Sequence, residues 1–217
     1  MWKTVKKARL KGRRTLFEDE VIRRLHEVLP PGVTVTLLAD RGFGDQKLYK
    51  FLTELGFGFI IRFRGVVAVG SLAGEVRQAG AWVPPNGRVR HLAGAKVMQD
   101  RYGFDAVVCV KVLGMKEPGY LAVGGVTIVG ATAVKLYARR FTIDETFRDT
   151  KDPRYGLGLS ATHVRDVSRR DRLFLICAMA MTLLTLLGAA GESLGMDRML
   201  KANTVKKRTH LALPPWL

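Results

Sequence analysis

A charged segment in the C-terminal half of the chain has the residue types and spacing to handle phosphate groups. Tyr137, Arg140, Asp144, Arg148 and Lys151 follow one another at intervals of three, four, four and three residues. On an α-helix this spacing places all five on one face about 21 Å long. A carboxylate between cations can bind a divalent metal ion while the cations bind neighbouring phosphates. The alternative is a ladder of surface ion pairs, each worth only a few tenths of a kcal/mol.

A second candidate carboxylate, Asp40, ends an apolar segment. Residues 33–40 read VTVTLLAD, which predicts a buried strand, and Arg41-Gly42 follow directly. In open α/β sheets, functional groups gather at the carboxyl ends of strands, where an Asp can reach a hard cation such as Mg²⁺. Asp is also common in turns, so the alternative is that Asp40 only caps the next turn.

The segments around Asp40 alternate between helical and strand patterns over the first 65 residues, which predicts an α/β core with parallel strands. Asp45 is well placed to cap the second helix, and Gly56 to end it. Helices are expected over 16–29 and 45–56, and strands over 33–40 and 57–65.

Residues 66–130 differ from this core. Glycines are frequent, VPPNG at 83–87 predicts a turn, and short β-rich segments recur up to VTIVGA at 126–131. These features predict a β-rich insertion. Helical spacing returns over 132–152, so residues 131–217 are expected to be mainly helical, ending in a basic tail.

A helix is also predicted over 164–195, and its central part, residues 173–190, is apolar. This 18-residue segment is at the lower limit for spanning about 30 Å of hydrocarbon. A membrane anchor is one interpretation. A helix buried on all sides in a soluble core is the interpretation that we prefer.

The charge of the chain indicates a polyanionic partner. Lys and Arg number 36 against 19 acidic residues, and residues 1–14 carry seven cations and no acid. Cations that contact phosphates release counterions, so this excess favours nucleic acid over other partners. The first 14 residues are either a solvated terminus or a phosphate-binding arm. Two separate cysteines and four scattered histidines predict neither a disulfide framework nor a zinc site, and the absence of a signal peptide predicts a cytoplasmic protein.

The charged segment resembles a signature of one protein family. The chain is similar to the C-terminal two-thirds of a bacterial insertion-sequence transposase of the DDE class, in its fourth-family group. That group carries a Tyr-x2-Arg-x3-Glu-x6-Lys signature, which Tyr137, Arg140 and Lys151 match. Asp144 stands at the Glu position, with Glu145 directly after it.

Two further segments carry the same resemblance. LLADRGF resembles the strand of the second catalytic acid, which places that acid at Asp40. The basic tail LKANTVKKRTHLAL, residues 200–213, is common in the group. The resemblance implies an RNase H-like domain with a β-rich insertion between the second and third acids. Glu145 points about 100° away from the face of the signature helix, so Asp144 is the preferred third acid.

The resemblance also implies an activity and partners. Two Mg²⁺ ions held by three carboxylates would support cleavage and transfer of double-stranded DNA at transposon ends and target, with a homodimer on the DNA and no membrane. The first acid should lie on a strand before Asp40, where the only aspartate is Asp19, in a predicted helix. We therefore expect a truncated copy that binds DNA but cuts it poorly. The alternative is a non-catalytic basic DNA-binding remnant.

Overall fold

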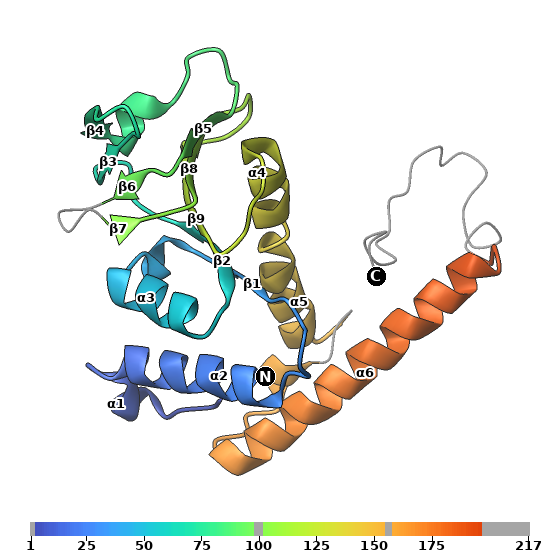
Figure 1. Ribbon diagram of the computed structural model, residues 1–217. Helices are drawn as coiled ribbons and strands as arrows, with labels where there is room; N and C mark the ends of the chain where they lie inside the picture. Colours follow the sequence, from blue (N-terminus) through green and yellow to red (C-terminus); the bar gives the residue numbers. More distant parts are fainter. Residues whose placement is uncertain (1–2, 98–101, 155–157, 197–217) are drawn as a thin grey trace. The chain divides into compact units, whose positions relative to one another are not determined.

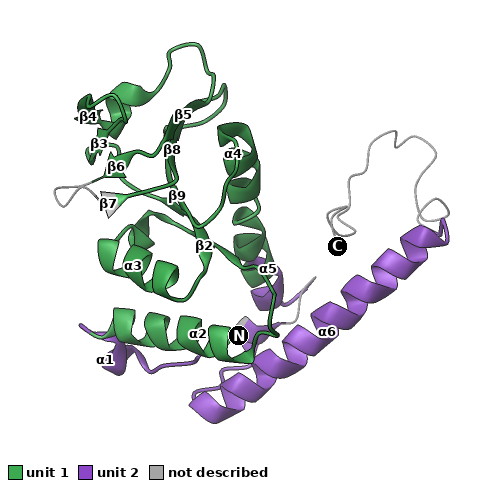
Figure 2. Ribbon diagram, viewed as in Figure 1, with its two compact units in different colours: residues 1, 13–147 green, residues 2–12, 148–217 purple. Residues whose placement is uncertain are grey.

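The computed structural model describes residues 3–97, 102–154 and 158–196. It consists of two compact units, coloured green and purple in Figure 2. The first unit comprises residues 1 and 13–147, and the second comprises residues 2–12 and 148–217. The basic tail at residues 200–213 lies outside the described residues.

The first unit is built on a five-stranded sheet with the order β1-β2-β9-β8-β5 (Figure 1). Strands β1 and β2 are parallel, with Leu37 opposite Phe59, which confirms the predicted parallel pair. The other neighbours in the sheet are antiparallel. The strands are β1 (Thr36–Ala39), β2 (Gly58–Arg62), β5 (Arg90–Ala93), β8 (Ala106–Val110) and β9 (Gly119–Gly124).

Both faces of this sheet are buried. Along β2, Phe59 and Ile61 join one apolar cluster, whereas Ile60 between them joins a second cluster. Strand β8 alternates in the same way, with Val107 in the first cluster and Val108 in the second. Successive side chains of a strand point to opposite faces, so two clusters mean two covered faces. Strands that are buried on both faces read as continuous apolar runs, which is why the sequence of β2 was recognisable.

Helices cover the two faces. Helix α2 (Arg14–Val28) contributes Ile22 and Leu25 to the first cluster, and α3 (Gln46–Glu54) contributes Leu48, Tyr49 and Leu52. Helix α4 (Gly130–Ala138) contributes Ala133 and Tyr137 to the second cluster. Helices α3 and α4 accordingly lie on opposite sides of the strands in Figure 1. This mixed arrangement of helices and sheet confirms the predicted RNase H-like α/β fold class.

The helix and strand signals of the first 65 residues are confirmed closely. Asp45 caps α3, because its Oδ1 accepts a hydrogen bond of 3.1 Å from the backbone N–H of Lys47. Gly56 follows α3 with a φ of 69°, the left-handed conformation that favours glycine after a helix.

The strands of residues 66–130 are divided between two sheets. Three of them, β5, β8 and β9, extend the sheet of β1 and β2. The others form a small antiparallel sheet in the order β4-β3-β6-β7. The indole N–H of Trp82 donates to the carbonyl of Val69 at 3.2 Å and so ties the turn η2 (Ala79–Trp82) to β3. The bounds are β3 (Ala68–Gly70), β4 (Val76–Gln78), β6 (Lys96–Val97) and β7 (Tyr102–Gly103).

The expectation of a strand at residues 126–131 was wrong. The chain turns away from the sheet at Gly125, whose φ is 67° and where a Cβ would lie 2.9 Å from the Cα of Gly58. The N–H of Val126 then donates to Asp105 Oδ2 at 3.2 Å instead of to a neighbouring strand. Helix α4 begins at Gly130.

The expectation of one continuous helix over residues 132–152 was also wrong. Helix α4 ends at Ala138, and α5 (Phe141–Lys151) begins after a two-residue turn. The N–H groups of Arg139 and Arg140 each donate to a carbonyl three residues earlier, at 3.0 Å. Bonds of this 3₁₀ type tighten the chain and interrupt the regular α-helical ladder.

In the second unit, α6 (Val167–Ser193) confirms the predicted long helix but not its expected burial. Asp166 caps it, accepting a hydrogen bond of 2.9 Å from Arg169 N. No residue of α6 is buried, and Leu184 and Leu187 are 63% and 69% exposed. Among the described helices, α6 alone is long and apolar enough to cross a membrane by length and composition. Within the described structure, the interpretation as a buried core helix is therefore wrong.

Candidate active site

The first site residue, Asp40, lies where β1 ends and the short turn η1 (Arg41–Phe43) begins. Its Oδ1 accepts a hydrogen bond of 2.7 Å from the N–H of Arg41, and its carbonyl accepts one of 2.9 Å from Phe43. Asp40 therefore does cap the next turn. The same hydrogen bond fixes the carboxylate at the carboxyl end of β1, the position expected for a functional group.

Tyr137, in the last turn of α4, is close enough to Asp40 for the two groups to interact electrostatically. Burial, followed by the negative charge of Asp40, raises the pKa of the Tyr137 phenol, and the charge of Arg140 acts in the opposite direction. The ring belongs to the second apolar cluster, its hydroxyl oxygen is buried, and a hydrogen bond with the Arg140 side chain also lowers the pKa of the phenol.

Arg140 links Tyr137 to the third candidate acid. Its guanidinium carbon lies 4.8 Å from the ring centroid of Phe141 and 5.9 Å from that of Tyr137. Its Nη1 lies 3.6 Å from Asp144 Oδ2. The Arg140 side chain is 16% exposed and that of Asp144 is 64% exposed. An ion pair with so exposed a partner contributes about 0–1 kcal/mol, so Asp144 can exchange Arg140 for another cation at little cost.

The remaining predicted site residues lie on α5. Glu145 is exposed and follows Asp144 in the first turns of the helix. Arg148 and Lys151 are in its last turn and belong to the second unit, and Arg148 Nε lies 3.7 Å from Asp149 Oδ1. Helix α5 therefore keeps the spacing of Asp144, Arg148 and Lys151. Tyr137 precedes the break on α4, and Arg140 lies within the break.

Two further charged residues near Asp40 and Tyr137 were missed in the sequence. Glu117 Oε2 lies 3.4 Å from Arg62 Nη2 and 3.6 Å from Arg41 Nη1. Arg62 also donates to the Pro118 carbonyl at 3.1 Å, and its charge lowers the pKa of Tyr137. The sequence did contain a signal for Arg62, because it is the one charged residue of the strand GFIIR and stands at the end of this apolar segment.

Carboxylate oxygens are the ligands that Mg²⁺ prefers, so Asp40 and Asp144 suit a hard cation by their chemistry. Within the described residues, however, no group of three or more His, Cys, Asp or Glu side chains is placed to hold a metal ion. The part of the chain that the structure describes therefore shows no assembled metal site, and Asp40 and Asp144 remain candidate ligands.

Comparison with known proteins identifies the family of the chain. The sequence model of the transposase DDE domain matches residues 8–183, a segment that includes Asp40, Tyr137, Arg140 and Asp144. A search of curated proteins gave no match. The family match covers most of the chain, and it extends from the first residues of α1 (Lys7–Leu10) into α6. The chain therefore belongs to the transposase DDE domain family.

Proposed function

We propose that this chain is the catalytic region of an insertion-sequence transposase that binds double-stranded DNA at transposon ends and target. In this proposal Asp40 and Asp144 are two of the carboxylates that bind Mg²⁺ for DNA strand cleavage and transfer. The observation that carries the proposal is the chain of interactions from Asp40 through Tyr137 and Arg140 to Asp144. It links the end of β1 to the start of α5, the two places where the family resemblance puts catalytic acids.

Each of these side chains has a distinct task in the proposal. Asp40 is held by the N–H of Arg41, and its negative charge acts on the Tyr137 phenol. Bound Mg²⁺ would polarise the phosphate and activate the attacking oxygen. Arg140 and Lys151 bind and orient phosphate oxygens near the cut, and Arg148 binds a neighbouring phosphate. The Tyr137 hydroxyl donates a hydrogen bond to a phosphate oxygen.

The first catalytic acid of the family is the weakest point of the site, because Asp19, the only aspartate before Asp40, lies on helix α2. The third acid also departs from the family signature. Asp144 is one methylene shorter than the Glu of the signature, and Glu145 is exposed and one position further along α5. The family resemblance implies three carboxylates around two Mg²⁺ ions, so a site with two of them lacks one metal ligand. We therefore infer that the chain by itself binds DNA and cuts it slowly or not at all. We also infer a homodimer on DNA and a location in the cytoplasm with the nucleoid.

The alternative function is a basic DNA-binding protein without catalysis, favoured by the net charge of +17 and by the absence, among the described residues, of three acidic or other ligands grouped to hold a metal ion. Replacing both acids distinguishes the two. Asp40→Asn with Asp144→Asn should abolish the Mg²⁺ dependence of DNA binding if the carboxylates hold metal. A plain binder should bind DNA equally well or slightly better after losing two negative charges.

The experiment is a fluorescence anisotropy titration of labelled double-stranded DNA with and without Mg²⁺. Glu27→Gln with Glu54→Gln is the matched control, because these exposed acids lie on α2 and α3 and carry the same charge. The proposal fails if Mg²⁺ has no effect on the unmodified chain, or if its effect survives in the Asp40/Asp144 variant. A plasmid-nicking assay adds a second test: efficient Mg²⁺-dependent nicking that Asp40→Ala abolishes would overturn the inference of poor cutting.

A further inference from the structure

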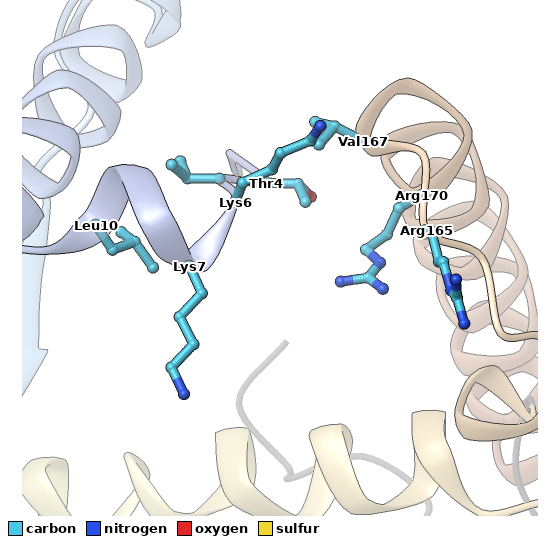
Figure 3. A pocket seen from close by; sticks show the side chains of 8 residues that line it. Thr4, Lys6, Lys7, Leu10, Arg165, Val167 and Arg170 are labelled. Atoms are coloured by element: carbon cyan, nitrogen blue, oxygen red, sulfur yellow. The ribbon is translucent and has the colours of Figure 1, made fainter.

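The second unit contains a cavity of about 510 Å³ that is separate from the residues discussed so far (Figure 3). It is lined by residues 4–7 and Leu10, at and before α1, and by three residues at and before the start of α6. Figure 3 shows the side chains of Lys7 and Leu10 on one side of the cavity, and those of Arg165 and Arg170 on the other.

The charges around this cavity have one sign. Four of the eight lining residues are cations, Lys6, Lys7, Arg165 and Arg170, and none is an acid. Asp166 is adjacent in sequence, but its carboxylate is used to cap α6 through the N–H of Arg169. Four cations that share a cavity without a counter-charge repel one another, and an anion would relieve this repulsion.

The geometry suits a phosphate-bearing group. All four cations are exposed, whereas Thr4, Val5, Leu10 and Val167 in the same lining are half-buried. Cavities of roughly 300–1,000 Å³ are typical of sites for small organic groups, so a nucleotide unit fits the volume. The Arg170 guanidinium is already oriented, since its Nη2 donates to the Val164 carbonyl at 2.7 Å. An oriented guanidinium loses less side-chain entropy when it binds phosphate.

We propose that this cavity is a second phosphate-binding site, at which Lys6, Lys7, Arg165 and Arg170 hold the backbone of double-stranded DNA. The inference rests on the proposed function, because it assumes that DNA is the polyanion. It deepens that function because it assigns to the second unit part of the affinity for DNA that does not depend on the DNA sequence. It also assigns the N-terminal cations a role as a phosphate-binding arm.

The test is fluorescence anisotropy of the full chain with a labelled DNA duplex over a series of salt concentrations. Lys7→Gln with Arg165→Gln removes two cavity cations and leaves the Arg170 hydrogen bond intact. Arg88→Gln with Lys111→Gln is the matched control, since it removes the same two charge types from exposed positions of the first unit. Circular dichroism of each variant checks that the helices are retained.

We expect the cavity variant to weaken DNA binding about tenfold at moderate salt and to reduce the slope of log affinity against log salt by about 2. The control should change affinity less than about twofold, in keeping with general charge loss alone. If the cavity variant and the control weaken DNA binding equally, the proposed cavity site is wrong. The proposal that the chain binds DNA would not be affected by that result. No DNA binding by the unmodified chain would overturn the proposed function as well.

Two further measurements separate DNA from other phosphate sources. Inorganic phosphate that binds the unmodified chain but not the cavity variant, with DNA affinity equal in both, would show a small-anion site and overturn the proposal. Co-sedimentation with phosphatidylserine/phosphatidylcholine vesicles provides the other test. If the cavity variant loses vesicle binding and keeps DNA binding, lipid headgroups are the ligand and the proposal is wrong.

Discussion

The carboxylate of Asp40, at the end of β1, is close enough to the phenol of Tyr137, at the end of α4, to raise its pKa. The two residues come from distant parts of the sequence, and the packing of α4 on β2, β8 and β9 brings them together. Arg140 then extends the group to Asp144. This electrostatic interaction between the end of β1 and the signature segment is the basis of the proposed site.

The influence of Asp40 on Tyr137 can be measured directly. Replacing Asp40 by Asn removes a negative charge that disfavours the phenolate, so the pKa of Tyr137 should fall. Ultraviolet absorbance of phenolate during a pH titration reports it, with a Tyr137→Phe variant subtracted to isolate this residue. Glu27→Gln is the control and should leave the pKa in place. An unchanged pKa after Asp40→Asn would mean that the two groups do not face each other.

The two cysteines should differ sharply in reactivity. Burial raises the pKa of the Cys109 thiol to about 12, whereas Cys177 on α6 is half-buried. At pH 8, roughly one Cys109 thiol in ten thousand is ionised, and the thiolate is the reactive form. Iodoacetamide should therefore label one cysteine rapidly in the folded chain, and Cys177→Ala should remove that fast phase. Rapid labelling that persists in the Cys177→Ala variant would contradict the buried position of Cys109 in β8.

Leucines of the sheet core and of α6 should contribute very differently to stability. Leu52 is fully buried, so Leu52→Ala should cost about 2–5 kcal/mol of unfolding free energy. Leu184 is 63% exposed, and Leu184→Ala should cost less than about 0.5 kcal/mol. Urea unfolding followed by circular dichroism, which detects both helices, provides the comparison. Similar costs at the two positions would show that α6 is covered by other protein in solution.

Local patterns in the sequence predicted much of the fold. The cap at Asp45, the glycine after α3 and the apolar runs of β1 and β2 each depend on residues close together in the chain. The break at Arg139 and Arg140 was not predictable in this way. At the break, backbone hydrogen bonds between residues three apart replace the α-helical bonds between residues four apart. The spacing of the charged side chains in the sequence is compatible with both patterns.

Other features depend on contacts between distant segments. Glu117 and Arg62 are 55 residues apart, and no local pattern pairs them. The exposure of α6 could not be read from its composition either, because an apolar helix of this length suits a protein core and a bilayer equally. The candidate site residues Asp40, Tyr137, Arg140 and Asp144 were predicted from their types, their spacing and the family resemblance. Their mutual placement required the packing of α4 against the sheet.

The central claim is that Asp40 and Asp144 bind the same divalent cation. Fe²⁺ can replace Mg²⁺ at a site of oxygen ligands, and with ascorbate and peroxide it generates radicals that cut the nearby backbone. Mass spectrometry of the fragments maps the cuts. The account predicts cuts at both Asp40–Gly44 and Phe141–Glu145, with both lost in Asp40→Asn and retained in Glu27→Gln. Cuts at only one of these segments, or a pattern that Asp40→Asn leaves unchanged, would contradict a shared metal site.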